Sequence, residues 1–201
     1  MPLDNTSKIS NGFIHLVKGS DGSTVSGLTI NNTKGALSIN GIYVGQLHGI
    51  WITKSNNNTI VNNTIRIANA AGVYAMPMGW SSYNRIIGND MSTYITCVMV
   101  MGQCHYNIIS KNKLETLDYN DLIVSNLIYF NPFGHADYGG SPLCLGNVIS
   151  DNYLKAFCNG AMSIVLQLVY ENHINTTIAN NTIIRGSYGI SLYSDNATVY
   201  N

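Results

Sequence analysis

The chain carries very little charge. Only 10% of its 201 residues are Asp, Glu, Lys or Arg, and ten basic residues balance ten acidic ones, whereas an average soluble protein has about 25% charged residues. Nucleic acids and anionic lipids are bound by clusters of basic side chains, so the composition argues against both kinds of partner. Uncharged polar residues must provide the soluble surface, and the most frequent of them is asparagine, with 27 copies.

Long apolar segments are missing as well. The longest apolar runs, such as 98–101, are far too short to cross a bilayer, so we expect no membrane segment in this chain. The N-terminus has neither the basic nor the apolar region of a signal peptide. Because a surface rich in Asn, Gly, Ser, Thr and Tyr is common in extracellular proteins, we expect an extracellular or cell-surface location, with the signal peptide outside this chain.

The four cysteines include no CxxC pair, the spacing found in many zinc sites. They are Cys97, Cys104, Cys144 and Cys158. Free cysteine behaves as a small apolar residue, so we expect buried thiols. A Cys97–Cys104 disulfide and a Cys104–His105 pair of metal ligands are the alternatives.

Segments with the period of an amphipathic helix are also missing, whereas Ile, Val, Thr and Tyr are abundant, which favours short β-strands. One pattern, N-x-I-x-x-N-x-I, occurs five times, with Thr allowed at the first position and Leu or Met at the last. The second asparagines of the five copies are Asn63, Asn89, Asn112, Asn152 and Asn181. Degenerate copies lie at 23–30 and 197–201. The separations of 23 to 40 residues are typical of the turns of a solenoid.

The spacing within the pattern predicts a corner. Its two apolar positions are five residues apart, so in one straight strand they would point to opposite faces. Both can face the core only if the chain bends between them, and asparagine tolerates the left-handed backbone of such a bend. We therefore expect the five asparagines at corners, in left-handed conformation, stacked in a ladder of side-chain hydrogen bonds.

A second apolar block lies between successive copies and supplies a third strand per turn. These blocks are 49–52, 72–76, 94–102, 160–169 and 188–193. The fold class expected is all-β, a parallel β-helix of about 6–8 coils with three short strands each. We expect one domain over 1–201 with a loop insertion at 131–144. Because 197–201 begins a copy without completing it, we also expect an excerpt of a longer solenoid, with further repeats of the parent protein as neighbours.

This repeat resembles the right-handed parallel β-helix repeat of the pectate-lyase-like superfamily over roughly 23–201. It is most similar to the Asn-rich branch with NosD-like periplasmic proteins and archaeal adhesin-like surface proteins. The right-handed coil is implied by this resemblance. Proteins of this fold include lyases, hydrolases, epimerases and non-catalytic modules, so the resemblance does not choose among functions.

The 131–144 loop holds the side chains best suited to catalysis. His135 and Asp137 could supply a general base, and Tyr138 a general acid, for proton abstraction beside a sugar carboxylate. The resemblance implies that a lyase would hold Ca²⁺ with clustered Asp and Glu and work with Arg or Lys, and this sequence has no such cluster. We therefore expect no metal and no cofactor, with Ca²⁺ possible only for a lyase.

Two functions stay open. The first is a non-catalytic cell-surface module of an adhesin-like protein, structural or binding a polysaccharide or cell-surface glycan. Aromatic side chains would then stack on sugar rings, and the candidates are Trp51, Tyr74, Trp80 and Tyr94. The second is a carbohydrate-active enzyme (a polysaccharide lyase, glycoside hydrolase or epimerase) with the 131–144 loop as one wall of its groove. The low charge favours the first function.

The sequence also contains seven N-x-S/T triplets, which are acceptor sites for N-linked glycans in secreted proteins. They begin at Asn5, Asn31, Asn57, Asn62, Asn175, Asn180 and Asn196. Because Asn62 and Asn180 each precede a corner asparagine, we expect their side chains to point outward.

Overall fold

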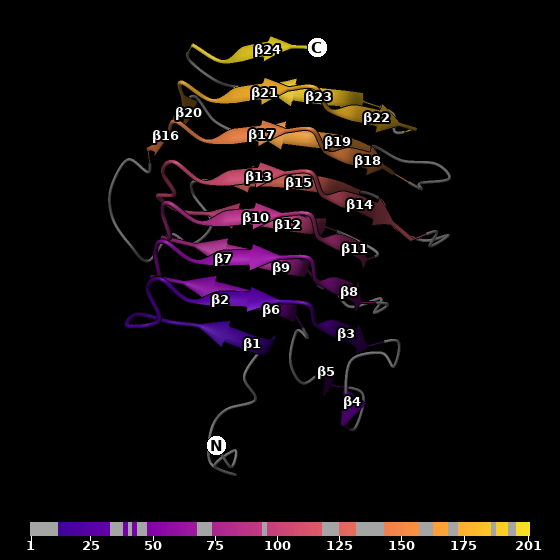
Figure 1. The fold of residues 1–201 in the computed structure, drawn as a ribbon. Coiled ribbons are helices and arrows are strands. Elements are labelled where there is room, and N and C mark those ends of the chain that lie inside the picture. The colour runs from indigo at the N-terminus through magenta and orange to yellow at the C-terminus, as the bar shows by residue number, and fades with distance from the viewer. Residues whose placement is uncertain are drawn as a thin grey trace.

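Parallel strands stack in regular rungs along one axis in the computed structural model (Figure 1). The structure describes residues 12–32, 38–39, 42–43, 48–67, 74–93, 96–117, 125–131, 143–156, 163–168, 173–185, 188–192 and 196–201. Every regular element in these ranges is a β-strand. They contain no helix that could span a membrane.

Three parallel sheets run along the molecule. In the described residues, each of the first six rungs contributes one strand to each sheet, and the seventh contributes strands to sheets A and B. Sheet A contains β1 (Gly12–Leu16), β6 (His48–Thr53), β9 (Tyr74–Gly79), β12 (Thr96–Met101), β15 (Ser125–Asn131), β19 (Ser163–Leu168) and β23 (Tyr188–Leu192). Sheet B contains β2 (Thr24–Ser26), β7 (Thr59–Val61), β10 (Arg85–Ile87), β13 (Ile108–Ser110), β17 (Val148–Ser150), β21 (Thr177–Ala179) and β24 (Thr198–Tyr200). Sheet C contains β3 (Thr29–Asn32), β8 (Thr64–Ile67), β11 (Asp90–Thr93), β14 (Lys113–Thr116), β18 (Tyr153–Lys155) and β22 (Thr182–Ile184).

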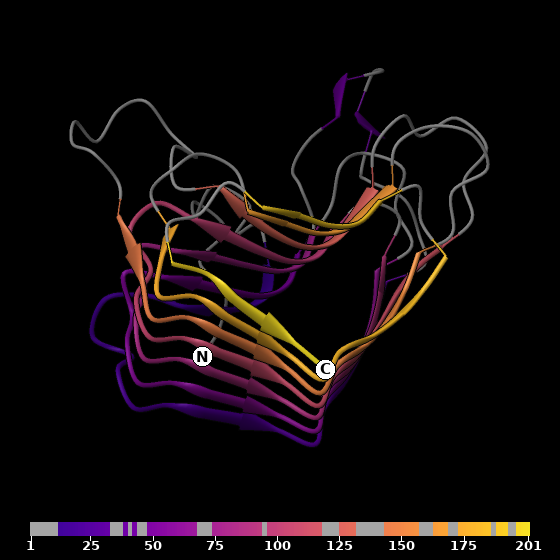
Figure 2. The ribbon, with the colours of Figure 1, turned by 90° about the horizontal axis from the view of Figure 1, so that it is seen from above.

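Two short pairs complete the set: the parallel pair β16 (Cys144–Leu145) and β20 (His173–Ile174), and the antiparallel pair β4 (Ser38–Ile39) and β5 (Ile42–Tyr43). Seen from above, the three sheets enclose a three-sided bore, and sheets B and C meet at a sharp corner (Figure 2). In Figure 1 the near strands of sheet B run to the right while the rungs rise toward the C-terminus, so the coil is right-handed. The expected parallel β-helix is confirmed, with seven strands in each of sheets A and B.

The bore is filled by columns of apolar side chains, one residue per rung, held in register by the parallel strands. The inward column of sheet B consists of Val25, Ile60, Ile86, Ile109, Ile149 and Ile178. The corresponding column of sheet C consists of Ile30, Ile65, Met91, Leu114 and Leu154. All eleven are buried, and burying each such side chain contributes about 1.5–3 kcal/mol. The two apolar positions of the repeat therefore both face the core, as its odd spacing predicted.

The bend between the two apolar positions of the repeat differs in one respect from the expectation. The left-handed residue is not the ladder asparagine but the residue before it. Positive φ angles occur at Gly27, Asn62, Gly88, Lys111, Asp151 and Asn180. The left-handed residue turns the chain and stays at the surface, whereas the asparagine after it points its amide into the wall of the bore, where it is buried in Asn63, Asn89, Asn112 and Asn152.

These asparagines form a ladder in which every hydrogen-bonding position of the side chain is used. In the middle rung, Asn112 Oδ1 accepts hydrogen bonds from the backbone N–H and from Nδ2 of Asn89, at 2.9 and 3.1 Å. Asn112 Nδ2 donates to Asn152 Oδ1 at 3.0 Å and to the Ile86 carbonyl at 2.9 Å. The same pattern begins at Asn63 and continues to Asn181. An amide can be buried here because all its partners are present.

A second ladder follows the corner between sheets A and B. It uses the first asparagine of the repeat in each rung, Asn58, Asn84, Asn107 and Asn147, joined Nδ2 to Oδ1 at 2.9, 3.3 and 3.2 Å. Their backbone N–H groups donate to the same oxygens. Each of these rungs is thus tied to the next at two corners.

Three of the cysteines are free and buried, as expected: Cys97, Cys104 and Cys144. The alternative of a Cys97–Cys104 disulfide is wrong. Burial raises the pKa of the Cys144 thiol to about 11, so it stays protonated and unreactive at neutral pH. Cys158 lies outside the described residues.

Replacing Asn112 with leucine tests the ladder. The substitution removes four hydrogen bonds and leaves buried donors and acceptors in both neighbouring rungs, so we expect the free energy of unfolding to fall by about 1–3 kcal/mol. Urea denaturation measures this change. Asn31→Leu is the matched control, since Asn31 is exposed on β3 and its loss should leave stability nearly unchanged. Equal midpoints for the two variants would contradict the proposed role of the ladder.

Candidate functional site

The structure describes only some of the side chains that the sequence marked as candidates. His135, Asp137, Tyr138 and Tyr94 lie outside the described residues, and of Tyr74 only the backbone, at the start of β9, is described. Trp51 and Trp80 are described and lie in different places. Trp51 is on the outer face of β6, and Trp80 follows β9 at the corner between sheets A and B.

Trp51 is held against histidine side chains. Its ring is parallel to that of its register partner His15 on β1, with centroids 4.5 Å apart and an interplanar angle of 7°. The edge of His48 meets the same indole at a centroid distance of 5.4 Å. One ring face of Trp51 is therefore already covered, which leaves it a smaller surface for a ligand than a free tryptophan would offer.

Trp80 lies flat on the next rung. Its φ is +47°, and the rung above presents Gly102 with φ +68° at the same corner. A Cβ atom added to Gly102 would lie 2.5 Å from the indole Cε2. The indole can occupy this place only because the residue above it has no side chain.

Two tyrosines repeat this arrangement three residues further along the corner. Tyr83 and Tyr106 lie in successive rungs, with ring centroids 5.2 Å apart and an interplanar angle of 19°. A Cβ on Gly146, in the following rung, would lie 2.5 Å from Tyr106 Cε1. Tyr83 is 54% exposed and Tyr106 47% exposed. We call Trp80, Tyr83 and Tyr106 the corner aromatic surface.

The backbone of this surface is strained. Tyr83 and Tyr106 have φ angles of +59° and +52°. A bulky residue in this conformation is an outlier, and sparsely populated backbone conformations cost about 1–3 kcal/mol each. The other rungs place small or amide residues at the same corner position, with positive φ in each: Gly22, Asn57, Gly146, Asn175 and Asn196. Folding does not require tyrosine here, and backbone strain of this kind gathers at functional sites.

A chain of polar side chains supports the corner aromatic surface. These side chains belong to the residues just before the left-handed residues Gly22, Asn57, Tyr83 and Tyr106. Each accepts a hydrogen bond from the backbone N–H of the equivalent residue in the next rung. Asp21 accepts from Asn56 and Asn56 from Ser82, both at 2.7 Å. Ser82 Oγ accepts from His105 at 3.0 Å, and His105 Nδ1 from Leu145 at 3.2 Å. The corner backbone below the aromatic rings is therefore held rigidly.

The best-defined charged groups lie elsewhere, on the outer face of sheet C. Arg66 forms an ion pair with Asp90 at 2.7 Å, and Lys113 lies 3.9 Å from Asp90 and 3.5 Å from Glu115. These acids therefore face cations. Within the described ranges no group of three or more His, Cys, Asp or Glu side chains could hold a metal ion.

The N-x-S/T triplets coincide with the corners. Asn57, Asn62, Asn175, Asn180 and Asn196 are exposed and have φ angles between +52° and +57°. Each is followed by a corner position of the repeat and then by the threonine that begins a strand. The outward position expected for Asn62 and Asn180 is confirmed.

The stacked rungs and their asparagine corners define a parallel β-helix repeat protein. A model of the family described as protein of unknown function (DUF1565) matches residues 4–166, which is most of the 201-residue chain. The chain therefore belongs to that family, which is associated with β-helix repeat proteins. No curated protein matches the chain.

Gly102→Ala tests the packing of Trp80. The added methyl group would overlap the indole, and alanine is unfavourable at positive φ, so we expect a loss of about 1 kcal/mol or more in unfolding free energy and a shift in tryptophan emission. Gly79→Ala is the matched control, because a Cβ there would lie 3.9 Å from the Met101 carbonyl oxygen, an ordinary van der Waals contact. Identical melting temperatures and spectra for the two variants would show that the indole does not rest on Gly102.

A second test uses pH. Burial lowers the pKa of His105 below its usual value, and the unfolded chain therefore binds the proton at higher pH than the folded protein. Stability should fall as the pH drops below about 6.5, the usual histidine pKa. His105→Asn keeps an acceptor for the Leu145 N–H, as Asn56 does for Ser82, and removes the titration. We expect the melting temperature of this variant to fall less between pH 7 and pH 5 than that of the wild type. Some fall should remain, because burial also lowers the pKa of His15. If the melting temperatures of His105→Asn and the wild type fall equally, His105 does not cause the pH dependence.

Proposed function

We propose that this domain is a non-catalytic module of an adhesin-like extracellular or cell-surface protein that binds a polysaccharide along the corner aromatic surface. The observation that carries the proposal is the pair of tyrosines, about half exposed, at strained corner positions that asparagine or glycine occupies in other rungs. Tyrosine at these positions costs stability that asparagine or glycine would not, which supports a use for the rings.

The chemistry of the rings fits a sugar ligand. Tyrosine and tryptophan combine an apolar face with a polar tip, so they stack on a sugar ring and hydrogen-bond its hydroxyl groups. Trp80 and Tyr83 share a turn of one rung, and Tyr106 lies in the next. Rungs repeat about every 4.8 Å, so the surface extends along the solenoid axis, as a site for a polymer would.

The rigidity of the scaffold supports binding. Two asparagine ladders and the polar chain from Asp21 to His105 hold the corner backbone before any ligand arrives. A surface ordered in advance loses less conformational entropy when it binds. We propose that binding requires no cofactor and that the partner is a polysaccharide or cell-surface glycan.

Tyr83→Asn and Tyr106→Asn test the proposal, because asparagine occupies the same corner position in other rungs. Ligands would first be found on a glycan array, and affinities then measured by calorimetry. We expect each variant to bind about tenfold more weakly, equivalent to about 1.4 kcal/mol, without a lower melting temperature. Tyr153→Asn, on sheet C, is the control and should bind as the wild type does.

The same protein should be assayed for lyase and hydrolase activity on acidic polysaccharides. Turnover that disappears in His135→Ala or Asp137→Ala would identify a carbohydrate-active enzyme and overturn the non-catalytic proposal. Full affinity in both corner variants would leave the aromatic surface without a role in binding.

A further inference from the structure

Tyr83 and Tyr106 hold two phenol rings against each other in neighbouring rungs. Tyr83 precedes β10 and Tyr106 precedes β13, and these two strands pair in register. The ring centroids are 5.2 Å apart and the rings lie 19° from parallel. The backbone N–H of Tyr83 donates to the carbonyl of His105, next to Tyr106, at 2.9 Å. Strand pairing therefore keeps the two rings together in every folded molecule.

This stacked pair is a feature of the chain's surface and not of the repeat. Asparagine or glycine occupies the corner position of Tyr83 and Tyr106 in the other rungs, so the scaffold does not require two consecutive tyrosines. In the described strands, no other tyrosine pairs in register with a tyrosine. The register partners are Met99 and Gln167 for Tyr129, Lys113 and Thr182 for Tyr153, and Ala179 for Tyr200.

Both phenols are open to solvent. Tyr83 is 54% exposed and Tyr106 47% exposed, so an oxidant can remove an electron from each ring and water can take the hydroxyl proton. Exposed side chains change rotamer within picoseconds to nanoseconds. The rings can therefore turn out of the stacked arrangement and bring the carbon atoms beside their hydroxyl groups into contact.

We propose that Tyr83 and Tyr106 form an oxidative cross-linking site, at which a peroxidase and hydrogen peroxide join the two rings as dityrosine. The bond ties two neighbouring rungs at the surface, beside the hydrogen bond from Asn84 to Asn107 that ties them inside. Cross-linking needs only the two phenols, so it does not depend on the proposed polysaccharide binding.

Atoms and electrons balance in this reaction. Each phenol loses one electron and its hydroxyl proton, which gives two phenoxyl radicals. The radicals form a carbon–carbon bond between the ring positions next to the two oxygens. The hydrogen atoms of those carbons then move as protons to the oxygens, which restores both phenols. Hydrogen peroxide takes the two electrons and the two released protons and becomes two water molecules.

Ring proximity directs the two radicals to each other. Groups held side by side react at effective concentrations far above those of separate molecules in solution. We therefore expect the bond within one chain, with a yield that does not depend on protein concentration.

Treating the purified protein with peroxidase and hydrogen peroxide tests the site. We expect the blue fluorescence of dityrosine and a mass lower by two hydrogen atoms, in a protein that stays monomeric on a denaturing gel. Trypsin cuts after Arg85 and so separates Tyr83 from Tyr106 unless the bond joins their peptides. Fragment masses must place the bond on these two residues and not on Tyr74 or Tyr94, which lie in the same peptides.

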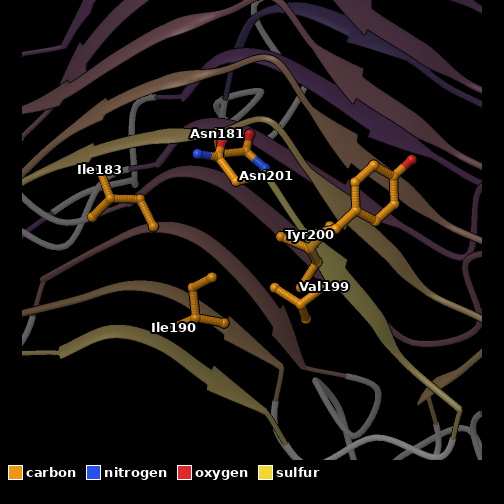
Figure 3. Close-up of a pocket in the computed structure, with 7 residues that line it drawn as sticks. Asn181, Ile183, Ile190, Val199, Tyr200 and Asn201 are labelled. Carbon is orange, nitrogen blue, oxygen red and sulfur yellow. The ribbon is translucent and has the colours of Figure 1, made fainter.

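Tyr83→Phe and Tyr106→Phe keep a ring at each position but remove the phenol. We expect dityrosine fluorescence to fall about tenfold or more in each variant. Tyr200→Phe is the matched control and should fluoresce as the wild type does. Tyr200 is 55% exposed, and its ring lies on the side of β24 away from Ile183 and Ile190 (Figure 3), but its register partner is not a tyrosine.

Full fluorescence in Tyr83→Phe or Tyr106→Phe, a bond mapped to other tyrosines, or covalent dimers as the main product would overturn the proposal. The absence of dityrosine from the treated wild type would do the same. Mapping the bond in the wild type decides the question even if a variant does not fold.

Discussion

The hydrogen bond between side-chain amides of neighbouring rungs is the interaction on which the rest of the structure depends. Strands of sheets B and C are only three or four residues long, too short to specify register by themselves. The ladder asparagine specifies it, because its Oδ1 takes two donors from the rung below while its Nδ2 reaches the rung above. Once the corners are aligned, the apolar columns meet in the bore and the strands pair in register.

The same constraint shapes the surface. A left-handed residue precedes each ladder asparagine, so each of these corners places one residue at or near the surface. Asparagine and glycine fill this position at the lowest cost, and they supply most corners. Tyr83 and Tyr106 depart from this pattern, and Trp80 occupies another left-handed position of the same corner, three residues before Tyr83. The Trp80 ring fits only beside Gly102 and the Tyr106 ring only beside Gly146, whereas Tyr83 stacks on Tyr106. This pairing between rungs links the scaffold to the surface that we propose binds a polysaccharide.

The ladder also gives the solenoid a direction. The backbone N–H and Nδ2 of Asn89 donate to Asn112 Oδ1, and those of Asn112 donate to Asn152 Oδ1, so the bonds all point the same way. A buried amide hydrogen needs an acceptor, whereas apolar surface accepts any apolar partner. Hydrogen-bond direction, as well as apolar area, therefore restricts which side chain fits the ladder position of the next rung.

The sequence by itself determined the architecture, because a repeat of fixed spacing imposes the same local geometry on every rung. Alternation and odd spacing were enough to predict the strands, the inward Ile60 and Ile65 and the bend between them. They could not show that Asn62, rather than Asn63, is left-handed, because asparagine suits both positions. Tertiary structure alone decided the contacts between rungs, since the intervals vary: Tyr106 meets Gly146 across 40 residues, beyond the reach of any local pattern. For that reason Trp80 was a candidate from the sequence, whereas its grouping with Tyr83 and Tyr106 emerged only from the structure.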